Sequence, residues 1–423
     1  MEAISKDVVI IGAGSGGLVL AILLAKKGFK VAIFERLSCL ASPPRGEIVQ
    51  PGSLEILDRL GLLTALLKED IYRFEKVHFY KVGGNVACKD ARLCTVNYGA
   101  LPPPYNYALV VLPERIQNLL LEEAIKQPNI EIFWESNFQS IVWAYGKPDK
   151  IVGAQVEHQG KTIVVNAPVI IGNDGWQSSV RLAFHIKANI HRYPNGYLAM
   201  MVDRPAGFDG HMKYYIGKGV VLAVFPVSDK QLFLLLMLSV ESFDLHRKRG
   251  IKALKEDILS VHPDIRDYLK TSFAHLHSFD VATFMKCFRV KCDRWVVDGG
   301  VLMGDSAHAM NPHTASGRNS AMADAVVLAE VLENCFRYKD FSRQALGEYE
   351  KLRRPYVDYL QSLGDQMVWV WESGWSPLVW ARDRIFRSLD KNPKRLEKIL
   401  MTMAGVKRTP FTSFDIARSF LDV

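Results

Sequence analysis

Three glycines near the start of the chain have the spacing of a nucleotide-binding turn. The stretch VVIIGAGSGGLVLAILLAKKGFKVAIFE, residues 8–35, places Gly12, Gly14 and Gly17 directly after a short apolar strand. Glycines at these offsets allow a tight turn, a close approach of the backbone to a pyrophosphate, and a helix packed against the strand. The turn therefore predicts a dinucleotide site made by Gly12, Gly14, Ser15, Gly16 and Gly17.

An acidic residue ends the second predicted strand of this unit. Glu35 stands where a carboxylate accepts hydrogen bonds from an adenosine ribose. Its charge disfavours the 2′-phosphate of NADP, while the free N–H groups of the intervening helix favour a diphosphate. We assign Glu35 and its neighbour Arg36 to the same site, which leaves NAD and FAD as candidates.

A second glycine-rich segment distinguishes between these two cofactors. VLMGDSAHAMNPHTASGRNSAMADA, residues 301–325, is an apolar strand, a loop and a helix that opens near Gly317. Asp305 at the strand end suits the ribityl chain of a flavin, and the helix N-terminus suits the negative charge of a reduced isoalloxazine. FAD is long enough to bridge Gly12 and Asp305, so the sequence predicts FAD, with Gly317 and Asn319 among its binding residues.

The elements around these segments predict an α/β fold with interleaved domains. We expect a Rossmann-like FAD-binding domain, a parallel sheet with helices, from residues 1–75, 106–185 and 286–335. Residues 76–105 and 186–285 favour a mostly antiparallel substrate-binding sheet. Residues 336–423 show helical periodicity and form a C-terminal helical region.

Composition narrows the class of protein. With 423 residues, 49% of them apolar and 23% charged, the chain is globular and can hold two domains. The net charge of +8 is scattered among acidic residues, which argues against nucleic-acid binding. The six cysteines have no paired spacing and no metal-ligand pattern, and no secretory signal or bilayer-length apolar run is visible, so we expect reduced thiols, no metal and a cytoplasmic location.

Three ordered segments resemble the FAD-dependent aromatic hydroxylases typified by para-hydroxybenzoate hydroxylase. They are the turn ending at Glu35, the stretch GNDGWQSSVR with Asp174, and the stretch beginning at Asp305. The resemblance implies that Asp174 serves both FAD and NAD(P)H, and that Arg45 and Arg115 contact FAD. It also implies that NADH or NADPH binds transiently as electron donor, and that a flavin hydroperoxide transfers oxygen from dioxygen to an aromatic or quinone-like substrate.

The sequence departs from that family at the last helix. Ala315 and Ser316 stand where Gly-Gln is usual, Ala321 replaces a glycine, and Asn173 replaces an alanine. A Cβ at position 315 costs free energy if that residue needs a positive φ. We therefore expect altered contacts to the flavin pyrimidine and a mild effect at position 173.

Catalytic candidates follow from the resemblance, because no Ser-His-Asp, Cys-His or metal arrangement is legible. Arg45, His308 and Pro312 are expected near the flavin ring, although a buried structural role for His308 is the simpler interpretation. Aromatic residues of the central sheet suggest an aromatic or quinone-like ligand, but they are also common core residues. These aromatic residues are Tyr214, Tyr215, Phe225 and Phe233.

The C-terminal region leaves two interpretations open. Trp369, Trp371, Trp375 and Trp380 precede Arg382, Arg384 and Arg387, as in a segment that contacts a membrane surface. Packing of terminal helices onto the catalytic domains is the simpler interpretation of the same segment. Two alternatives to a monooxygenase also remain at this stage: a flavin-dependent reductase on the same scaffold, and a dinucleotide-binding protein without catalysis.

Overall fold

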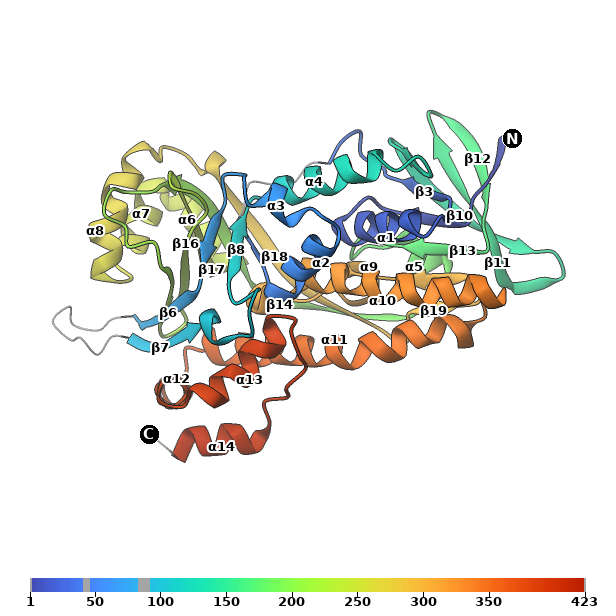
Figure 1. The fold of residues 1–423 in the computed structure, drawn as a ribbon. Helices are drawn as coiled ribbons and strands as arrows, with labels where there is room; N and C mark the ends of the chain where they lie inside the picture. Colours follow the sequence, from blue (N-terminus) through green and yellow to red (C-terminus); the bar gives the residue numbers. More distant parts are fainter. Residues whose placement is uncertain (1, 41–45, 83–91, 422–423) are drawn as a thin grey trace.

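A computed structural model describes residues 2–40, 46–82 and 92–421 of the chain. The molecule is elongated, with a mostly parallel sheet near one end, a mostly antiparallel sheet near the other, and a layer of C-terminal helices along one side (Figure 1). The α/β class and the C-terminal helices predicted from the sequence are confirmed.

The parallel sheet is built from short strands that lie far apart in the sequence, and its inner strands are fully buried. Five strands run parallel and β19 pairs antiparallel at one edge. Continuous apolar runs form these strands because both faces of the sheet are covered, as is usual for parallel sheets. In spatial order they are β19 (Val296–Val297), β20 (Gly300–Leu302), β13 (Val169–Gly172), β2 (Val8–Ile11), β3 (Val31–Phe34) and β9 (Ile130–Phe133).

Helices cover this sheet, and two smaller sheets adjoin it. Helix α1 (Ser15–Lys26) packs against both α10 (Gly317–Tyr338) and α4 (Pro113–Ile125). A four-stranded sheet has the order β1 (Glu2–Ser5), β12 (Lys161–Asn166), β11 (Lys147–His158) and β10 (Ser136–Ala144); a three-stranded sheet has the order β4 (Glu47–Val49), β8 (Ala108–Val111) and β5 (Tyr72–Phe74). Shorter helices are α2 (Pro51–Arg59), α3 (Leu63–Leu66), α5 (Ser179–Ala183) and α9 (Asp305–His308), with 3-10 turns η2 (Tyr98–Ala100), η3 (Phe273–His275), η4 (Phe279–Val281) and η5 (Pro312–Thr314).

The seven-stranded sheet separates two cores by the alternation of its side chains. On β16 and β17, Leu222 and Leu234 pack toward α6–α8, while Phe225 and Phe233 belong to the core on the opposite face. The sheet order is β18 (Ala282–Cys292), β14 (Ala188–Asp203), β17 (Gln231–Ser239), β16 (Val221–Pro226), β15 (Met212–Ile216), β6 (Lys76–Lys81) and β7 (Arg92–Asn97). The outer helices are α6 (Val240–Arg249), α7 (Ile251–Leu259) and α8 (Pro263–Ser272).

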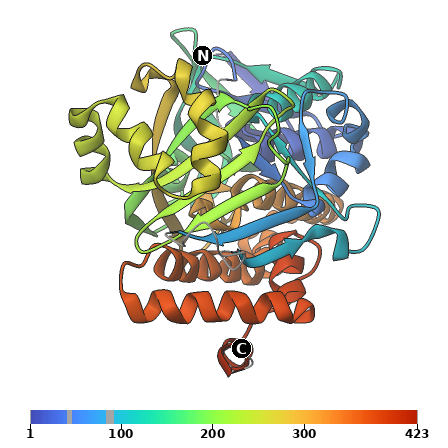
Figure 2. The ribbon, with the colours of Figure 1, turned by 90° about the vertical axis from the view of Figure 1, so that its left-hand side faces the viewer.

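The C-terminal helices form a separate layer beneath the sheets (Figure 2). They are α11 (Arg343–Trp371), α12 (Ser376–Lys391), α13 (Pro393–Met403) and α14 (Ser413–Leu421). Arg382 fixes α12, because its buried guanidinium donates to the Gly217 carbonyl at 2.9 Å and to Asp383 at 2.8 Å. In the part of the chain that the structure describes, no helix has the length and apolar character needed to cross a membrane.

A buried carboxylate joins α10 to its surroundings. Asp324, fully buried, accepts from His308 Nε2 at 2.6 Å, from Arg353 Nε at 2.8 Å and from the Gly304 amide at 3.1 Å. Burial by itself would raise the Asp324 pKa, but His308 and Arg353 together hold that pKa well below its usual range. His308 is therefore held in the core by Asp324, which agrees with a structural role for this residue.

This cluster gives a prediction for Asp324→Asn. The variant removes the buried carboxylate charge and leaves Arg353 and His308 without their anionic partner. The free energy of unfolding should therefore fall by about 3 kcal/mol at pH 7. Because the folded-state pKa is lowered, this stabilisation is full above the unfolded pKa of about 3.9 and is lost as pH falls through the folded pKa.

Thermal unfolding of the parent and Asp324→Asn should therefore differ most at pH 6–7, and the difference should shrink as the pH falls below about 4. Glu348→Gln, which removes only an exposed pair with Lys351, is the control and should leave the midpoint close to that of the parent. A difference that does not depend on pH would contradict the account.

Candidate functional site

Two adjoining cavities lie where the strands of the parallel sheet end. The turn cavity, about 370 Å³, is lined by Gly12 and Glu35, among others. The central cavity, about 450 Å³, is lined by Asp305, Pro312 and Gly317, among others. Both cavities include Gly14, Gln117, Asn173 and Gly175 in their walls. The two cavities thus adjoin along a shared wall, and together they extend from the acidic end of β3 to the loop before α10.

The glycine turn leaves no room for side chains. Gly12 has a φ of +104°, and a Cβ there would lie 2.4 Å from the Asn173 carbonyl oxygen. A Cβ at Gly17 would lie 2.6 Å from the Gly12 carbonyl oxygen, and one at Gly16 would lie 3.0 Å from the Ala321 carbonyl oxygen. The turn thus brings the N-terminus of α1 to the cavity, where free N–H groups suit a diphosphate.

Glu35 lies at the far end of the turn cavity and is held there by the backbone. Its two carboxylate oxygens accept from the Ala13 amide at 2.8 Å and from the Leu37 amide at 3.1 Å. The side chain of Arg36 lines the same cavity. An anchored carboxylate with remaining lone pairs suits the hydroxyl groups of a ribose.

Hydrogen bonds join the three glycine-rich segments, although they are far apart in the sequence. Asn173 Nδ2 donates to the Gly12 carbonyl at 2.9 Å. Ser306 Oγ donates to Asp174 at 3.0 Å and accepts from the Gly175 amide at 3.1 Å. Asn173, expected to be a mild replacement, therefore contributes a contact that alanine cannot make. Asp174 itself lines the turn cavity, where Ser306 holds its carboxylate.

The first turn of α10 supplies polar groups to the central cavity. Asn319 accepts from the Gln50 amide at 3.0 Å and donates to the carbonyls of Ile48 at 2.9 Å and Ala315 at 2.7 Å. Arg318 donates to Ser15 Oγ at 2.6 Å and pairs with Glu47. The wall of the central cavity thus joins the first glycine-rich segment of the chain to the last one.

Several predicted site residues lie elsewhere. Arg115 is exposed and pairs with Glu69 at 2.9 Å, while Gln117, two residues along α4, lines both cavities and donates to the Ala13 carbonyl at 3.0 Å. Arg45 lies outside the described residues. Of the three catalytic candidates, Pro312 is the one that the structure brings into the central cavity wall.

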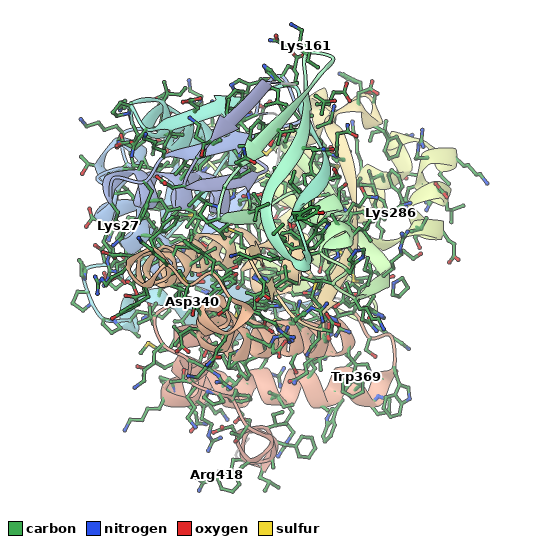
Figure 3. All side chains as sticks on the ribbon, turned by 90° about the vertical axis from the view of Figure 1, so that its right-hand side faces the viewer. Lys27, Lys161, Lys286, Asp340, Trp369 and Arg418 are labelled. Atoms are coloured by element: carbon green, nitrogen blue, oxygen red, sulfur yellow. The ribbon has the colours of Figure 1, made fainter. Side chains whose placement is uncertain are left out.

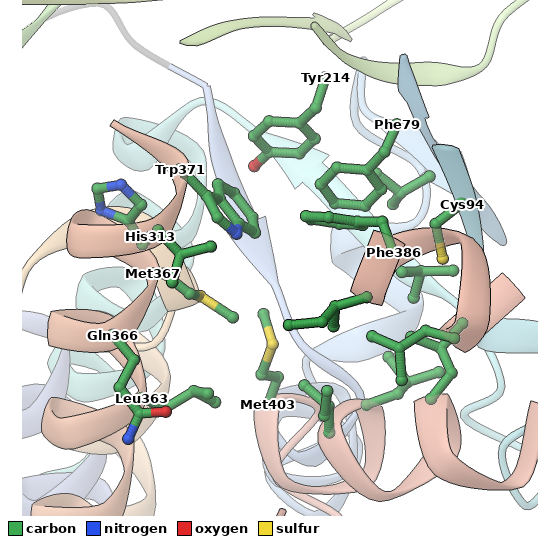
Figure 4. A pocket seen from close by; sticks show the side chains of 18 of the residues that line it. Phe79, Cys94, Tyr214, His313, Leu363, Gln366, Met367, Trp371, Phe386 and Met403 are labelled. Carbon is green, nitrogen blue, oxygen red and sulfur yellow. The ribbon is translucent and has the colours of Figure 1, made fainter. Parts of the chain in front are cut away.

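A third cavity, the apolar cavity, lies between the seven-stranded sheet and the helical layer. Its volume is about 450 Å³, and it shares Ile48, Tyr214 and Ala315 with the central cavity. Figure 4 shows Tyr214, Phe79 and Trp371 around its upper part, where their rings pack edge-to-face or stacked. The sequence analysis assigned Tyr214 to a ligand, but it named Trp369, Trp371 and Arg382 of this wall only as part of a terminal helical segment.

Tyr214 brings an unengaged hydroxyl to the boundary between these cavities. Among the described residues, the hydroxyl has no hydrogen-bond partner within the chain, and it points into the apolar cavity (Figure 4). Burial raises the pKa of Tyr214, so the group stays a neutral phenol at physiological pH. It is thus a donor for a polar atom of a bound molecule.

His313 adds a buried polar group at the same boundary. Its Nε2 lies 2.8 Å from the Tyr197 hydroxyl and 3.0 Å from Glu372 Oε1, and Asn195 donates to the other Glu372 oxygen at 2.7 Å. Burial and the Glu372 carboxylate raise the Tyr197 pKa well above its usual value. The sequence analysis missed His313; its one available signal was its position directly after Pro312.

The chain matches the model of one protein family, the FAD binding domain family, over residues 5–361. It is 29% identical over 350 residues to a 6-methylpretetramide 4-monooxygenase of Streptomyces rimosus, covering 82% of this chain and 80% of that protein. It is 27% identical to a kynurenine 3-monooxygenase of Salinispora tropica, covering 85% and 78%. A crystal structure of p-nitrophenol 4-monooxygenase from Pseudomonas putida DLL-E4 has a TM-score of 0.78 at 22% identity, covering 96% of this chain and 100% of that one.

Ala315 lies in the left-handed region, with φ 48° and ψ 38°, at the point where the cavities meet. The strain expected from an alanine in this position is therefore present. Ala315→Gly should raise the free energy of unfolding by up to about 1 kcal/mol. The left-handed conformation costs an alanine about 1–2 kcal/mol, and this cost is larger than the entropy that a glycine loses on folding.

Thermal unfolding tests this prediction, with Ala323→Gly in the middle of α10 as the matched control. The control should lose about 1 kcal/mol, because glycine weakens a regular helix. Equal losses in the two variants would show that position 315 carries no left-handed strain.

Proposed function

Because the chain belongs to the FAD binding domain family and is an FAD-dependent monooxygenase driven by NADH or NADPH, we propose that FAD lies along the joined turn and central cavities. The substrate then lies beyond the flavin ring, against Pro312 and Tyr214. The observation that carries the proposal is the continuity of these cavities from Glu35 to Pro312 through Gly14.

The residues present fit this cofactor from end to end. Glu35 and Arg36 are proposed to hold the adenosine, and Gly12–Gly17 with the N-terminus of α1 the diphosphate. Asp305 is proposed to bind the ribityl chain, and Gly317 and Asn319 the flavin ring. We add three residues to this predicted set because they line the central cavity: Gln117, Ser316 and Arg318. Asp174 is proposed to act as a positioning residue through Ser306.

FAD reduced by NADH or NADPH supplies the activation of dioxygen, which side chains alone do not provide. The protein itself positions the substrate, excludes water from the site and stabilises developing charge. The apolar faces of Phe225, Phe233 and Met285 in the central cavity exclude water beside Pro312. The N-terminus of α10 favours negative charge on the neighbouring ring system.

The substrate is proposed to be an aromatic or quinone-like molecule with at least one hydroxyl or carbonyl group. Tyr214 supplies a neutral hydroxyl donor at the meeting point of the cavities, and His313 lies in the wall beside it. A ring oxygen of the substrate that faces Tyr214 fixes which carbon of the ring faces Pro312. Such orientation is the main contribution that positioning residues make to the rate.

Two finer proposals concern the surroundings of the enzyme. A cytoplasmic location suits the need for NADH or NADPH and the buried thiols of Cys94, Cys287, Cys292 and Cys335.

Trp371 packs inside the fold, whereas Trp369, Trp375 and Trp380 are about two-thirds exposed, and Figure 3 shows Trp369 at the edge of the helical layer. Contact of these indoles with a membrane surface is a separate proposal, tested by cosedimentation with anionic vesicles.

Gly14→Val should remove FAD from the protein. A valine Cβ would lie 3.1 Å from Asn173 Nδ2, and its methyl groups would fill the space where the diphosphate approaches the backbone. FAD affinity, measured by fluorescence titration of the FAD-free protein, should fall at least about tenfold. Gly347→Val is the control, since the nearest atom to a Cβ there is 4.0 Å away. Undiminished FAD affinity in Gly14→Val would place the cofactor elsewhere.

The reaction itself is tested with labelled oxygen. Purified enzyme with FAD, NADPH and a panel of phenols under ¹⁸O₂ should form a product that carries one labelled oxygen atom. The same reaction in labelled water should leave the inserted oxygen unlabelled. Label from water, or reduction of a double bond without oxygen consumption, would reject monooxygenation and favour the reductase alternative.

A further inference from the structure

The apolar cavity extends beyond the space that an aromatic ring needs. Its inner end is at Tyr214 and Ala315, where it meets the central cavity. Its wall also includes Trp369 and Ile416, whose exposed fractions are 65% and 37%. The cavity is therefore a passage that leads from the proposed flavin ring, between the sheet and the C-terminal helices, to the protein surface.

The polar groups of the wall are used within the protein or lie at the ends of the passage. Tyr98 donates to Gln50 at 3.1 Å near the inner end. The guanidinium of Arg382 is bound to Gly217 and Asp383, so it does not offer free donors to the cavity. Gln366 is exposed at the outer side. The stretch between these ends is hydrocarbon, with Leu363, Met367, Phe386, Leu389, Leu400 and Met403 in its wall.

The shape of this wall favours a flexible guest. Met367 and Met403 face each other across the passage in Figure 4, and methionine adapts to chains of varied conformation. The helices α11, α12 and α13 supply one side, whereas Phe79 and Cys94 of the sheet supply the other. Protein interiors leave few voids larger than a water molecule, so a cavity of about 450 Å³ between packed elements indicates a ligand.

We propose that the apolar cavity binds the hydrocarbon chain of the substrate, so that the enzyme acts on a phenol or quinone carrying a long aliphatic substituent. This inference rests on the proposed function for the placement of the ring. The ring oxygen lies against Tyr214, the reacting carbon faces Pro312, and the chain passes Met367 and Met403 toward Trp369. The C-terminal helices thus determine substrate specificity.

Binding to the FAD-loaded enzyme without NADPH tests the proposal independently of turnover. Phenol, 4-butylphenol and 4-octylphenol are titrated by calorimetry. Each methylene that leaves water for the cavity should lower the dissociation constant about fourfold, the equivalent of about 0.8 kcal/mol per buried CH₂. The gain from phenol to 4-butylphenol should therefore be about 250-fold. Equal affinities along the series would overturn the proposal.

A matched pair of variants locates the chain. Met403→Trp places a bulky ring in the passage and should weaken 4-octylphenol binding at least about tenfold, while phenol binding stays unchanged. Met401→Trp is on the same helix but outside the cavity wall, and should leave both affinities unchanged. Equal loss of 4-octylphenol affinity in both variants would overturn the placement. If Met403→Trp does not fold, the chain-length series in the parent still decides.

The outcomes separate this inference from the proposed function. Affinity that rises with chain length, in an enzyme that incorporates no oxygen from ¹⁸O₂, would support the chain site and reject the reaction. Oxygen incorporation into phenols whose affinity is independent of chain length would reject the chain site and support the reaction.

Discussion

The carboxamide of Asn319 holds together the wall on which both halves of the proposed active site depend. It accepts from the Gln50 amide and donates to the carbonyls of Ile48 and Ala315. These contacts fix the end of β4, the start of α2 and the strained residue before α10 in one arrangement. Ile48 and Ala315 are also two of the three residues that the central and apolar cavities share. A single side chain and its three backbone partners thus hold together the wall between the central and apolar cavities.

The antiparallel sheet serves two purposes through the alternation of its strands. Leucines on one face close a core under α6–α8, and aromatic side chains on the other face the cavities. Neighbouring residues such as Phe233 and Leu234 therefore lie on opposite sides of the sheet and have different roles. Because the core on the outer face stabilises the sheet, the inner face remains available to line a ligand cavity. The C-terminal helices close that face without filling it.

Local patterns predicted many of the residues that line the turn and central cavities. The positions of Gly12, Glu35, Asp305 and Gly317 at strand ends and helix starts follow from spacing alone, because a turn between a buried strand and a helix allows few conformations. The same patterns did not show which face of a helix a residue occupies. On α4 the cavity receives Gln117 rather than Arg115, since two residues on a helix differ by about 200° of rotation.

Tertiary contacts decided the rest, and the sequence did not reveal them. Both His308 and His313 flank Pro312, but the buried Asp324 holds His308 in the core, while Tyr197 and Glu372 hold His313 beside the apolar cavity. The apolar cavity itself forms between elements far apart in the sequence, and some of its neighbours, such as Phe79 and Phe386, are separated by more than 250 residues. Such partners become neighbours only when the helical layer packs onto the sheet.

The central claim is that the flavin ring lies where the central cavity meets the apolar one. A crystal structure of the FAD-loaded enzyme tests it most directly. The account predicts electron density for the adenosine beside Glu35 and for the isoalloxazine ring within about 4 Å of both Pro312 and Ala315. A ring found away from these residues, or an adenosine bound outside the turn cavity, would contradict it.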